Sequence, residues 1–558
     1  MDRLLQRIYP EWAHRVIDIP KRSVYSILAQ SASKYSGNVA IEFIGKKITY
    51  GELKETVDSI SISLGEIGIK KGDRVSLMMP NIPQYPIFFF AILKIGGIIV
   101  QTNPLYTTFE LEHQVEDSGS DTIVVMDDFI DKVISLYPSR IKRIIVVRAE
   151  DYLPKIVAGL YSLSKRIKKT RKRIPKSENI FVLRNSKRKQ WESFEEKIDP
   201  LTQPALLQYT GGTTGIAKGA VLSHMNLVSN AYQIVEWLPP EYKREISYLS
   251  AIPFFHVYGM MTALLTPMLQ GSKIIIVPDP RDTHMLVKTM SKKKPVAFPG
   301  IPAMYHSILY FKDVKKYNIK AVKVCISGAS PLPEELQNNF ERETKALIVE
   351  GYGLSESSPV ANVNPLDASK RKVGSIGLPL PNTYERIVDI ENGQTDMKVG
   401  EVGELIIKGP QVMLGYWNNQ SETQSTLRDG WLYTGDIAKM DENGFVYIVD
   451  RKKDLIIASG YNVYPREVEE VLYSYPKVSE AAVVGIEDPH RGENVKAYVV
   501  LKKGENATEE EIREFCGKHL AVYKVPKIVE FRESLPMSLV GKVLKRELKN
   551  ENKSVEPQ

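Results

Sequence analysis

A glycine-rich loop reads Tyr209-Thr210-Gly211-Gly212-Thr213-Thr214-Gly215-Ile216-Ala217-Lys218-Gly219-Ala220 and follows a short apolar run at residues 205–207. Its glycines let the backbone turn tightly and bring N–H groups close to a ligand. The threonine hydroxyls can donate hydrogen bonds, and Lys218 adds a mobile positive charge. A generic glycine turn does not explain three threonines and a lysine in so short a stretch. The loop therefore predicts a phosphate cradle. It is not a Walker A loop, because Gly219 rather than Ser or Thr follows Lys218.

Strand-like apolar runs alternate with helical patterns on both sides of this loop. Residues 74–78, 97–100 and 322–326 have the pattern of strands, whereas residues 84–95 and 107–118 have that of helices. Such alternation predicts an α/β fold in which helices flank mostly parallel sheets and ligands bind at the C-terminal ends of strands.

Farther along the chain the pattern changes twice. From about residue 382, short strands separated by glycines predict a small β-barrel-like subdomain. A charged run, Asp450-Arg451-Lys452-Lys453-Asp454, then precedes an α+β pattern. We therefore predict a large domain with two sheets over residues 1–450, which includes the barrel-like subdomain at about 375–450. A short linker at 451–454 and a smaller domain over 455–558 follow.

The composition is that of a soluble globular protein, with 43% hydrophobic and 25% charged residues in a chain of 558. This length calls for at least two domains. The net charge of +8 is mild and gives no support for nucleic-acid binding. Two cysteines, Cys325 and Cys516, argue against a disulfide framework and favour the cytoplasm.

No targeting or membrane-spanning segment is predicted. Residues 1–20 mix charged side chains into their apolar positions and do not resemble a secretory signal. The most apolar stretch, residues 85–100, is shorter than the ~20 residues that span a bilayer. It is better explained as a buried helix followed by a buried strand.

One segment stands out by its charge: Lys165-Arg166-Ile167-Lys168-Lys169-Thr170-Arg171-Lys172-Arg173. A solvated surface excursion is the favoured interpretation. Apolar residues just upstream leave open an interfacial helix that contacts anionic lipids at the inner face of the membrane.

The glycine-rich loop resembles the signature of the adenylate-forming superfamily, which includes acyl- and aryl-CoA synthetases, firefly luciferase and the adenylation domains of peptide synthetases. Gly211 and Ala217 stand where many members have Ser and Pro, as in the long-chain fatty acyl-CoA synthetase branch. The resemblance runs from about Tyr25 to Lys549, and its motifs occur in family order. It implies a mobile C-terminal domain, with ATP, Mg²⁺ and coenzyme A as co-substrates.

Further motifs match the family's ATP site. A glycine-flanked aromatic, Tyr352, is suited to stack on adenine, and the carboxylate of Glu356 to hold Mg²⁺. Asp436 can accept two hydrogen bonds from a ribose diol. Ser355 replaces the commoner Thr and keeps its hydroxyl. The ATP- or AMP-binding residues that the resemblance implies are Thr210, Gly211, Gly212, Thr213, Thr214, Gly215, Lys218, Gly328, Ala329, Gly351, Tyr352, Gly353, Ser355, Asp436, Arg451 and Lys542.

An apolar stretch around His256 matches the family's acyl-binding region. A lone histidine in such a run is usually a core residue, but the resemblance gives His256 a site role. It need not act as a general base, because the acid substrate is already ionised at neutral pH. The expected acyl pocket comprises Phe255, His256, Tyr258, Met260, Phe298 and Gly300.

Three residues toward the C-terminal end match functional positions of the family's mobile domain and its hinge. Lys542 resembles the catalytic lysine that stabilises charge on the α-phosphate, although Met537 and Leu539-Val540 depart from the usual residues before it. Lys453 aligns with the hinge, and Gly460 with the channel for the pantetheine chain. The predicted catalytic residues are Lys542, His256, Thr210 and Glu356.

The sequence thus predicts that a medium-to-long-chain fatty acid is activated as an acyl-adenylate and transferred to coenzyme A. An aryl or short-chain acid, or a fatty acyl-AMP ligase with another acceptor, remains the alternative. Luciferase-type oxygenation is a rarer branch. A non-catalytic binding module would have lost Lys542, Glu356 or Lys218, and all three are present. A membrane scaffold acting through the basic segment, and a homodimer, also stay open.

Overall fold

The most apolar stretch of the sequence forms helix α4 (Gln84–Lys94) and strand β4 (Ile98–Gln101). Every residue of both elements is buried. Packing inside the protein therefore accounts for the apolar stretch, and a membrane is not needed to explain it. None of the helices in the described part of the chain combines the length and apolarity that a bilayer crossing requires.

The computed structural model describes residues 9–168, 170–183, 196–210, 217–458, 461–488, 492–538 and 542–553. The chain divides into two compact units. The first comprises Met1–Tyr384 and Ile407–Leu432, and the second Glu385–Ile406 and Tyr433–Gln558. The predicted linker at residues 451–454 lies inside the second unit, and its role as a hinge remains a prediction.

The first unit contains a nine-stranded sheet in the order β16-β15-β14-β13-β12-β10-β11-β1-β2. The strands from β14 to β1 in this order run parallel, and antiparallel pairing adds β15 and β16 on one side and β2 on the other. Their bounds are β1 Val39–Phe43, β2 Lys46–Thr49, β10 Ser247–Ser250, β11 Lys273–Ile276, β12 Ala297–Gly300, β13 Val324–Ser327, β14 Leu347–Gly353, β15 Val360–Val363 and β16 Leu378–Pro379.

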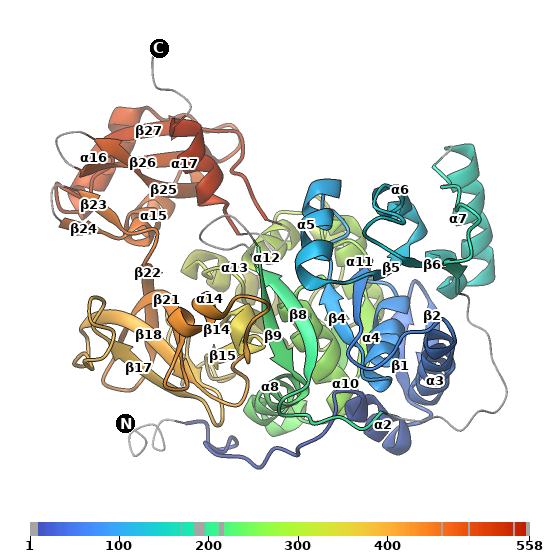
Figure 1. Cartoon of the computed structure of the whole chain (residues 1–558). Helices are drawn as coiled ribbons and strands as arrows, with labels where there is room; N and C mark the ends of the chain where they lie inside the picture. Colours follow the sequence, from blue (N-terminus) through green and yellow to red (C-terminus); the bar gives the residue numbers. More distant parts are fainter. Residues whose placement is uncertain are drawn as a thin grey trace. The chain divides into compact units, whose positions relative to one another are not determined.

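An eight-stranded sheet in the same unit has the order β19-β9-β8-β4-β3-β5-β6-β7. Its strands run parallel from β8 to β7, and β9 and β19 extend it antiparallel. The bounds are β3 Arg74–Met78, β5 Thr122–Met126, β6 Arg143–Val147, β7 Ile180–Val182, β8 Pro204–Thr210, β9 Lys218–Ser223 and β19 Gly415–Tyr416. Two helix-flanked, mostly parallel sheets confirm the predicted α/β class (Figure 1).

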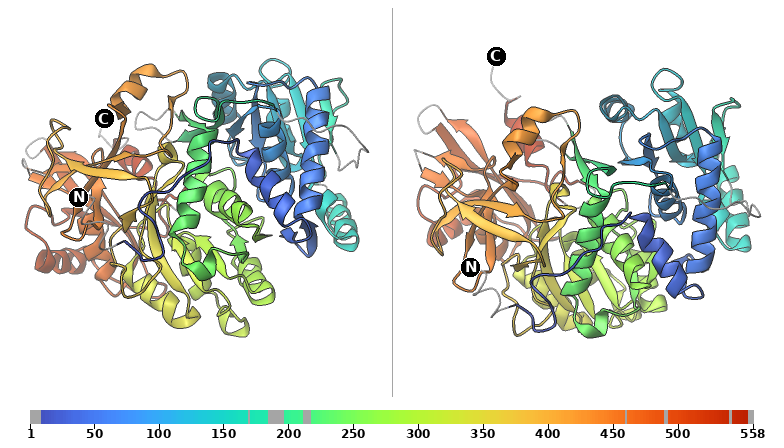
Figure 2. Two further views of the ribbon diagram at one scale, coloured as in Figure 1. Left: turned by 90° about the horizontal axis from the view of Figure 1, so that it is seen from below. Right: turned by 60° about the horizontal axis from the view of Figure 1, so that its bottom comes forward.

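Helices separate the strands along the chain, and Figure 2 shows the blue helices α2 and α3 side by side at the edge of the first unit. Side-chain caps start several of them. Thr107 and Glu110 form a reciprocal capping box on α5, and Ser223 and Asn226 do so on α8. The main helices are α2 Tyr25–Lys34, α3 Tyr50–Glu66, α5 Thr108–Ser118, α6 Ile130–Ile134, α7 Lys155–Ile167, α8 His224–Trp237, α9 Val257–Met260, α10 Thr266–Gln270, α11 Thr283–Lys293, α12 Pro302–Leu309, α13 Glu334–Thr344 and α14 Gln420–Thr426.

Two smaller sheets complete the chain. The predicted barrel-like region forms a five-stranded sheet of β17 (Tyr384–Val388), β18 (Val402–Lys408), β20 (Leu427–Arg428), β21 (Trp431–Met440) and β22 (Val446–Arg451). The C-terminal α+β pattern forms a second sheet of β23 (Ile456–Ala458), β24 (Tyr461–Val463), β25 (Val478–Asp488), β26 (Gly492–Leu501) and β27 (Ile528–Phe531). Its helices are α15 Pro465–Ser474, α16 Glu509–His519 and α17 Lys545–Lys553.

Candidate active site

The glycine-rich loop connects two antiparallel strands. Strand β8 ends at Thr210 and β9 begins at Lys218, and these two residues are paired in register. The hairpin is anchored to α5, because the Tyr209 hydroxyl donates to Asp117 at 2.5 Å. The predicted phosphate ligands Gly211, Gly212, Thr213, Thr214 and Gly215 lie outside the described residues. Of the predicted phosphate-binding residues in this loop, the structure therefore describes Thr210 and Lys218.

Lys218 belongs to a polar network that sequence reasoning did not find. Its Nζ lies 2.5 Å from Glu422 Oε1 and 5.8 Å from the centre of the Tyr416 ring. The Tyr416 hydroxyl donates in turn to Glu356 Oε1 at 2.8 Å. Burial raises the pKa of Tyr416, and the charge of Glu356 raises it further. The predicted phosphate lysine and the predicted metal ligand therefore share a neighbour.

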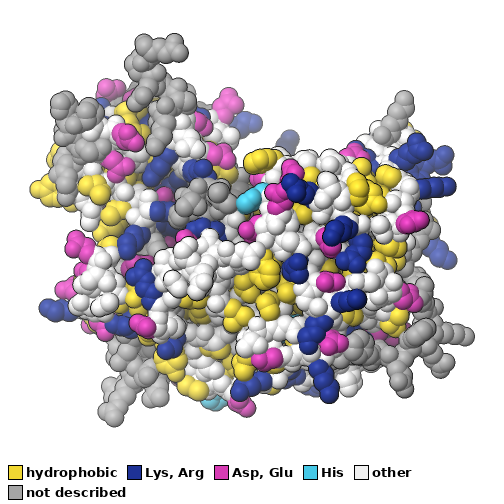
Figure 3. All heavy atoms as spheres, viewed as in Figure 1, with side chains coloured by type: hydrophobic (Ala, Val, Ile, Leu, Met, Phe, Trp, Pro, Cys, Tyr) yellow, Lys and Arg dark blue, Asp and Glu magenta, His cyan; other side chains and the backbone are white. Residues whose placement is uncertain are grey.

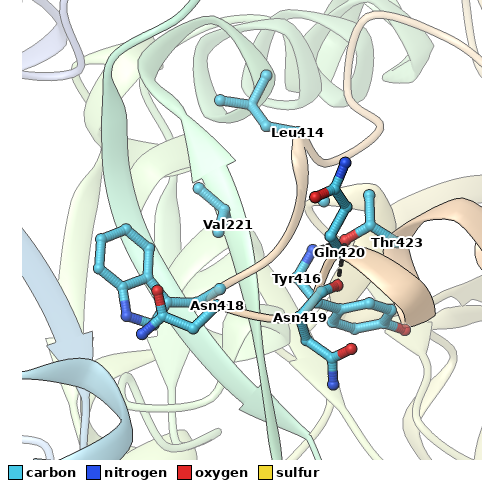
Figure 4. A pocket seen from close by; sticks show the side chains of 9 residues that line it. Val221, Leu414, Tyr416, Asn418, Asn419, Gln420 and Thr423 are labelled. Carbon is cyan, nitrogen blue, oxygen red and sulfur yellow. Dashed lines mark hydrogen bonds between the residues drawn. The ribbon is translucent and has the colours of Figure 1, made fainter.

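Glu356 is held by the short 3-10 helix η6 (Ser355–Ser357), which follows β14. Its backbone oxygen accepts a hydrogen bond from Met413 N–H at 2.8 Å, so the segment before β19 is fixed against it. A hollow opens beside β19. Val221 and Leu414 form an apolar wall, and the amides of Asn418, Asn419 and Gln420 surround it (Figure 4).

The predicted adenine-binding residues lie at the ends of neighbouring parallel strands. Gly300 of β12 pairs with Ser327 of β13, and Ser327 pairs with Glu350 of β14. Gly328 and Ala329 follow β13 directly, and Gly351, Tyr352 and Gly353 end β14. Since these strand ends share one edge of the sheet, residues from two separate motifs are brought together there.

Close packing explains why glycines stand at these strand ends. A Cβ on Gly353 would lie 1.9 Å from the carbonyl oxygen of Pro359, and one on Gly328 would lie 2.9 Å from the Tyr258 ring. At Gly300, a Cβ would lie 2.7 Å from the Tyr305 ring. The space at this edge is thus already used by backbone and aromatic rings.

His256 precedes α9, and its Nδ1 accepts a hydrogen bond from Tyr258 N–H at 3.3 Å. The buried Tyr258 hydroxyl donates to the carbonyl oxygens of Ile326 at 2.8 Å and Gly300 at 3.1 Å. Burial holds the pKa of Tyr258 well above its ordinary range. This histidine–tyrosine pair therefore connects the apolar stretch to the strand ends of the predicted adenine site.

A small apolar cavity of about 20 Å³ lies beside β12 and β13. Phe298, predicted for the acyl pocket, lines it and packs edge-to-face on Tyr305 with ring centres 5.3 Å apart. Met260 is fully buried, with its sulfur 3.5 Å from Gln101 Nε2, whereas Phe255 and His256 are partly exposed. The remaining lining residues, which the sequence did not single out, are Ile234, Leu238, Tyr242, Ile246, Tyr248, Thr262, Thr266, Ala297, Pro299, Val324 and Ile326.

The second unit contains the predicted ribose ligands and the predicted catalytic lysine, whereas Thr210, His256 and Glu356 lie in the first. Asp436 and Arg451 are paired in register on β21 and β22, and Arg451 Nε lies 2.8 Å from Asp436 Oδ1. Lys542 is close enough to both, and to Lys453, for their charges to act on its amine. The predicted channel residue Gly460 lies outside the described residues.

Lys542 is unusual among the lysines of this unit. Although the residue as a whole is exposed, desolvation of its amine by the surrounding protein, together with the charge of Arg451, lowers its pKa to about 8. Burial also lowers the pKa of Lys453. The backbone around Lys542 is fixed by two bonds, since Ser538 N–H donates to its carbonyl oxygen at 2.8 Å and its own N–H donates to Ser538 Oγ at 3.1 Å.

Two family models match the sequence of this chain. The AMP-binding enzyme family matches residues 28–417, and the AMP-binding enzyme C-terminal domain matches residues 467–542. The chain belongs to the AMP-binding enzyme family, which confirms the superfamily that the motifs predict.

Within this family, relatives with similar sequences are named as ligases of long-chain fatty acids and coenzyme A. A long-chain-fatty-acid–CoA ligase of Bacillus subtilis (strain 168) is 42% identical over 97% of each chain. One of Escherichia coli O157:H7 is 38% identical over 95% of this chain and 94% of that protein. Among solved structures, ATP-bound MatB from Rhodopseudomonas palustris has a TM-score of 0.82 at 27% identity and covers 96% of this chain and 100% of its own.

Proposed function

We propose that this enzyme uses ATP to convert a fatty acid into an acyl-adenylate with release of pyrophosphate, and then transfers the acyl group to coenzyme A with release of AMP. The observation that carries the proposal is the link from Lys218 through Tyr416 to Glu356, residues of motifs more than a hundred positions apart. A cation and a carboxylate around one half-buried tyrosine suit a site that binds phosphate and its metal ion.

The residues present fit Mg²⁺. Glu356 offers a carboxylate on a short helix, and Mg²⁺ usually binds through one or two carboxylates together with substrate phosphates and water. Among the described residues, no group of three or more His, Cys, Asp or Glu side chains could hold a metal alone. When bound, Mg²⁺ would neutralise phosphate charge. Tyr416 would orient the carboxylate by its hydrogen bond.

Lys218 is proposed to exchange one anionic partner for another. Its present partner is Glu422, at 2.5 Å. Phosphate oxygens, like carboxylate oxygens, accept charge-assisted hydrogen bonds from a lysine ammonium group. Thr210 is paired with Lys218 across the hairpin and would donate its hydroxyl to the same phosphates. The loop residues 211–215 would add backbone N–H groups, as would be typical of a glycine-rich cradle.

The first step needs positive charge where the carboxylate attacks the α-phosphate. With a pKa of about 8, Lys542 is roughly nine-tenths protonated at neutral pH and so carries that charge. Asp436 and Arg451, only 2.8 Å apart, would hold the ribose. In the second step the coenzyme A thiol attacks the acyl carbonyl and AMP leaves, with Gly460 lining the approach and residue 453 acting as the hinge.

A fatty acid is favoured over acetate by the walls of the predicted acyl region. The Phe298 and Met260 side chains of this region are fully buried and apolar, and His256 uses its Nδ1 for a backbone hydrogen bond rather than for proton transfer. The cavity beside Phe298 measures only about 20 Å³ and is too small to hold an acyl chain as it stands. The relatives named as long-chain-fatty-acid–CoA ligases support the same acid class. An aryl acid is the second candidate, since a probable 4-coumarate–CoA ligase of Dictyostelium discoideum is 34% identical over 89% of each chain.

The proposal is tested by measuring pyrophosphate release and thioester formation with acetate, decanoate, palmitate and 4-coumarate, each with and without coenzyme A. We expect the two fatty acids to turn over fastest and thioester to form only with coenzyme A. Faster turnover of acetate or 4-coumarate would refute the acid class. Adenylate without thioester in the presence of coenzyme A would indicate another acceptor.

A further inference from the structure

Helix α7 presents a continuous apolar row to solvent. Ile156, Leu160, Leu163 and Ile167 are exposed to 80%, 63%, 51% and 72%, respectively. Their spacing of four, three and four residues places them along one face of the helix. Single exposed apolar side chains are common, but four in one row on a 13-residue helix form a patch of the kind that marks an interaction surface.

The opposite side of α7 is fixed to the protein, so the helix cannot roll to bury this row. Lys165 is buried, and its Nζ lies 2.8 Å from Asp128 and 3.3 Å from Asp127. The same Nζ lies 4.8 Å from the centre of the Tyr161 ring. Burial alone would lower the pKa of Lys165, but the hydrogen bond to Asp128 and the charge of Asp127 raise it. Lys165 therefore anchors the helix and is not part of the exposed cationic segment that the sequence suggests.

Cationic side chains surround the exposed row. From Tyr152 to Ser177 the sequence contains nine Lys or Arg residues and no Asp or Glu. Arg166, Lys168, Arg171 and Arg173 are exposed, whereas Lys172 pairs with Asp131. Figures 1 and 2 show α7 at the outer edge of the first unit, and Figure 3 shows Lys and Arg side chains gathered on that side.

We propose that α7 docks the enzyme on an anionic phospholipid surface. The apolar row enters the boundary between head groups and acyl chains, and the exposed side chains of Arg166, Lys168, Arg171 and Arg173 contact lipid phosphates. A 13-residue helix is about 20 Å long, so it lies in the plane of the membrane and does not cross it. An excess of cations with no intervening acid fits this partner better than a neutral protein surface. The inference rests on the surface alone and does not require the proposed activity.

The test is co-sedimentation of the full chain with two kinds of vesicle, phosphatidylcholine alone and phosphatidylcholine with about a third phosphatidylglycerol. Leu160→Ser with Leu163→Ser removes the middle of the row. Its control is Tyr310→Ser with Val522→Ser, which removes two exposed apolar side chains elsewhere (63% and 81% exposed). Lys168→Gln, Arg171→Gln and Arg173→Gln remove charge, and their control changes the exposed Lys312, Lys315 and Lys320 to Gln.

We expect wild type to bind the anionic vesicles and to bind the neutral ones far more weakly. The leucine variant should bind at least about tenfold more weakly, because each buried methylene favours binding about fourfold. The charge variant should lose roughly fivefold for each cation, about 100-fold in all. Both controls should bind as wild type does, and all variants should keep its melting temperature.

Three results would overturn the inference. Wild type could fail to bind anionic vesicles. The control variants could lose binding as strongly as the α7 variants do. Wild type could also elute as a dimer that the leucine variant converts to a monomer, in which case a second copy of the chain covers the row.

Discussion

At the scale of single residues, the role of Glu356 depends on a neighbour that lies far away in the sequence. Tyr416 donates a hydrogen bond to this carboxylate and faces Lys218 with its ring. A hydrogen bond to a charged group contributes roughly 1.5–3 kcal/mol. Part of that free energy would orient Glu356 for the metal ion.

Tyr416→Phe should therefore raise the KM for Mg-ATP by about tenfold and leave the KM for the acid unchanged. Tyr447→Phe is a matched control, because it also removes a tyrosine–carboxylate hydrogen bond, to Asp441 at 3.3 Å. Initial rates of pyrophosphate release at varied Mg-ATP measure both variants. Equal KM values for Tyr416→Phe and wild type would contradict the orienting role.

Lys542 predicts a pH dependence of the first step. Its pKa is lowered to about 8, so its charge is lost as pH rises through that value rather than near 10.5. Where pyrophosphate formation limits the rate, wild type should fall to roughly a tenth of its neutral rate near pH 9. Lys542→Arg should be slower at neutral pH but should lose no further rate between about pH 7 and 9. A parallel decline in both enzymes would place the titrating group elsewhere.

At the scale of elements, the strand ends of β12, β13 and β14 form the best-predicted part of the site. The alternation of strands and helices, the capping signals such as Thr107, and the glycines at 351 and 353 are local signals, and the sequence shows them directly. The structure confirms the elements and adds the reason for these two glycines, which is the close approach of Ile326 to Gly351 and of the Pro359 carbonyl to Gly353.

Gly353→Ala should destabilise the protein by about 1–3 kcal/mol, because a methyl group there overlaps the Pro359 carbonyl. Gly65→Ala in α3 has no atom within 4 Å of the added Cβ and should stabilise by up to about 1 kcal/mol through helix propensity. Urea denaturation of both variants provides the comparison. A Gly353→Ala protein as stable as wild type would show that the strand end relaxes easily.

Other parts of the site depend on contacts between residues far apart in the sequence, which no local pattern predicts. Tyr416 and Glu422 meet Lys218 only because β19 pairs with β9, a contact between residues almost two hundred positions apart. The cavity beside Phe298 takes its walls from α8, β10 and the helical segment after α9, and no short motif marks such a set. The sequence places Lys165 in an exposed cationic segment, but the structure buries it. Its partners Asp127 and Asp128 lie on another element, so no local pattern marks their contact with Lys165.

At the scale of the whole molecule, each of the two units carries its own part of the predicted chemistry. The loop, Tyr352 and Glu356 belong to the first unit, and Asp436, Arg451 and Lys542 to the second. Length was enough to predict more than one domain, whereas the charged run at 450–454 lies inside the second unit and not at its boundary. The hinge at Lys453 is still a prediction taken from the family resemblance.

Lys453→Pro should separate the two half-reactions. Proline fixes φ and would restrict a rotation about this residue. We expect adenylate formation, followed as a pyrophosphate burst, to stay within about threefold of wild type, while thioester formation falls at least tenfold. Lys453→Ala keeps backbone freedom and should retain both steps more fully. Equal losses in both half-reactions would argue against a hinge here.

The central claim is that Lys542 serves acyl-adenylate formation. Its most direct measurement compares wild type, Lys542→Ala and the control Lys549→Ala in pyrophosphate release from ATP and palmitate, and in thioester formation from supplied palmitoyl-adenylate. We expect Lys542→Ala to lose about 100- to 1,000-fold in pyrophosphate release and to keep thioester formation, while Lys549→Ala keeps both. Undiminished pyrophosphate release by Lys542→Ala would contradict it.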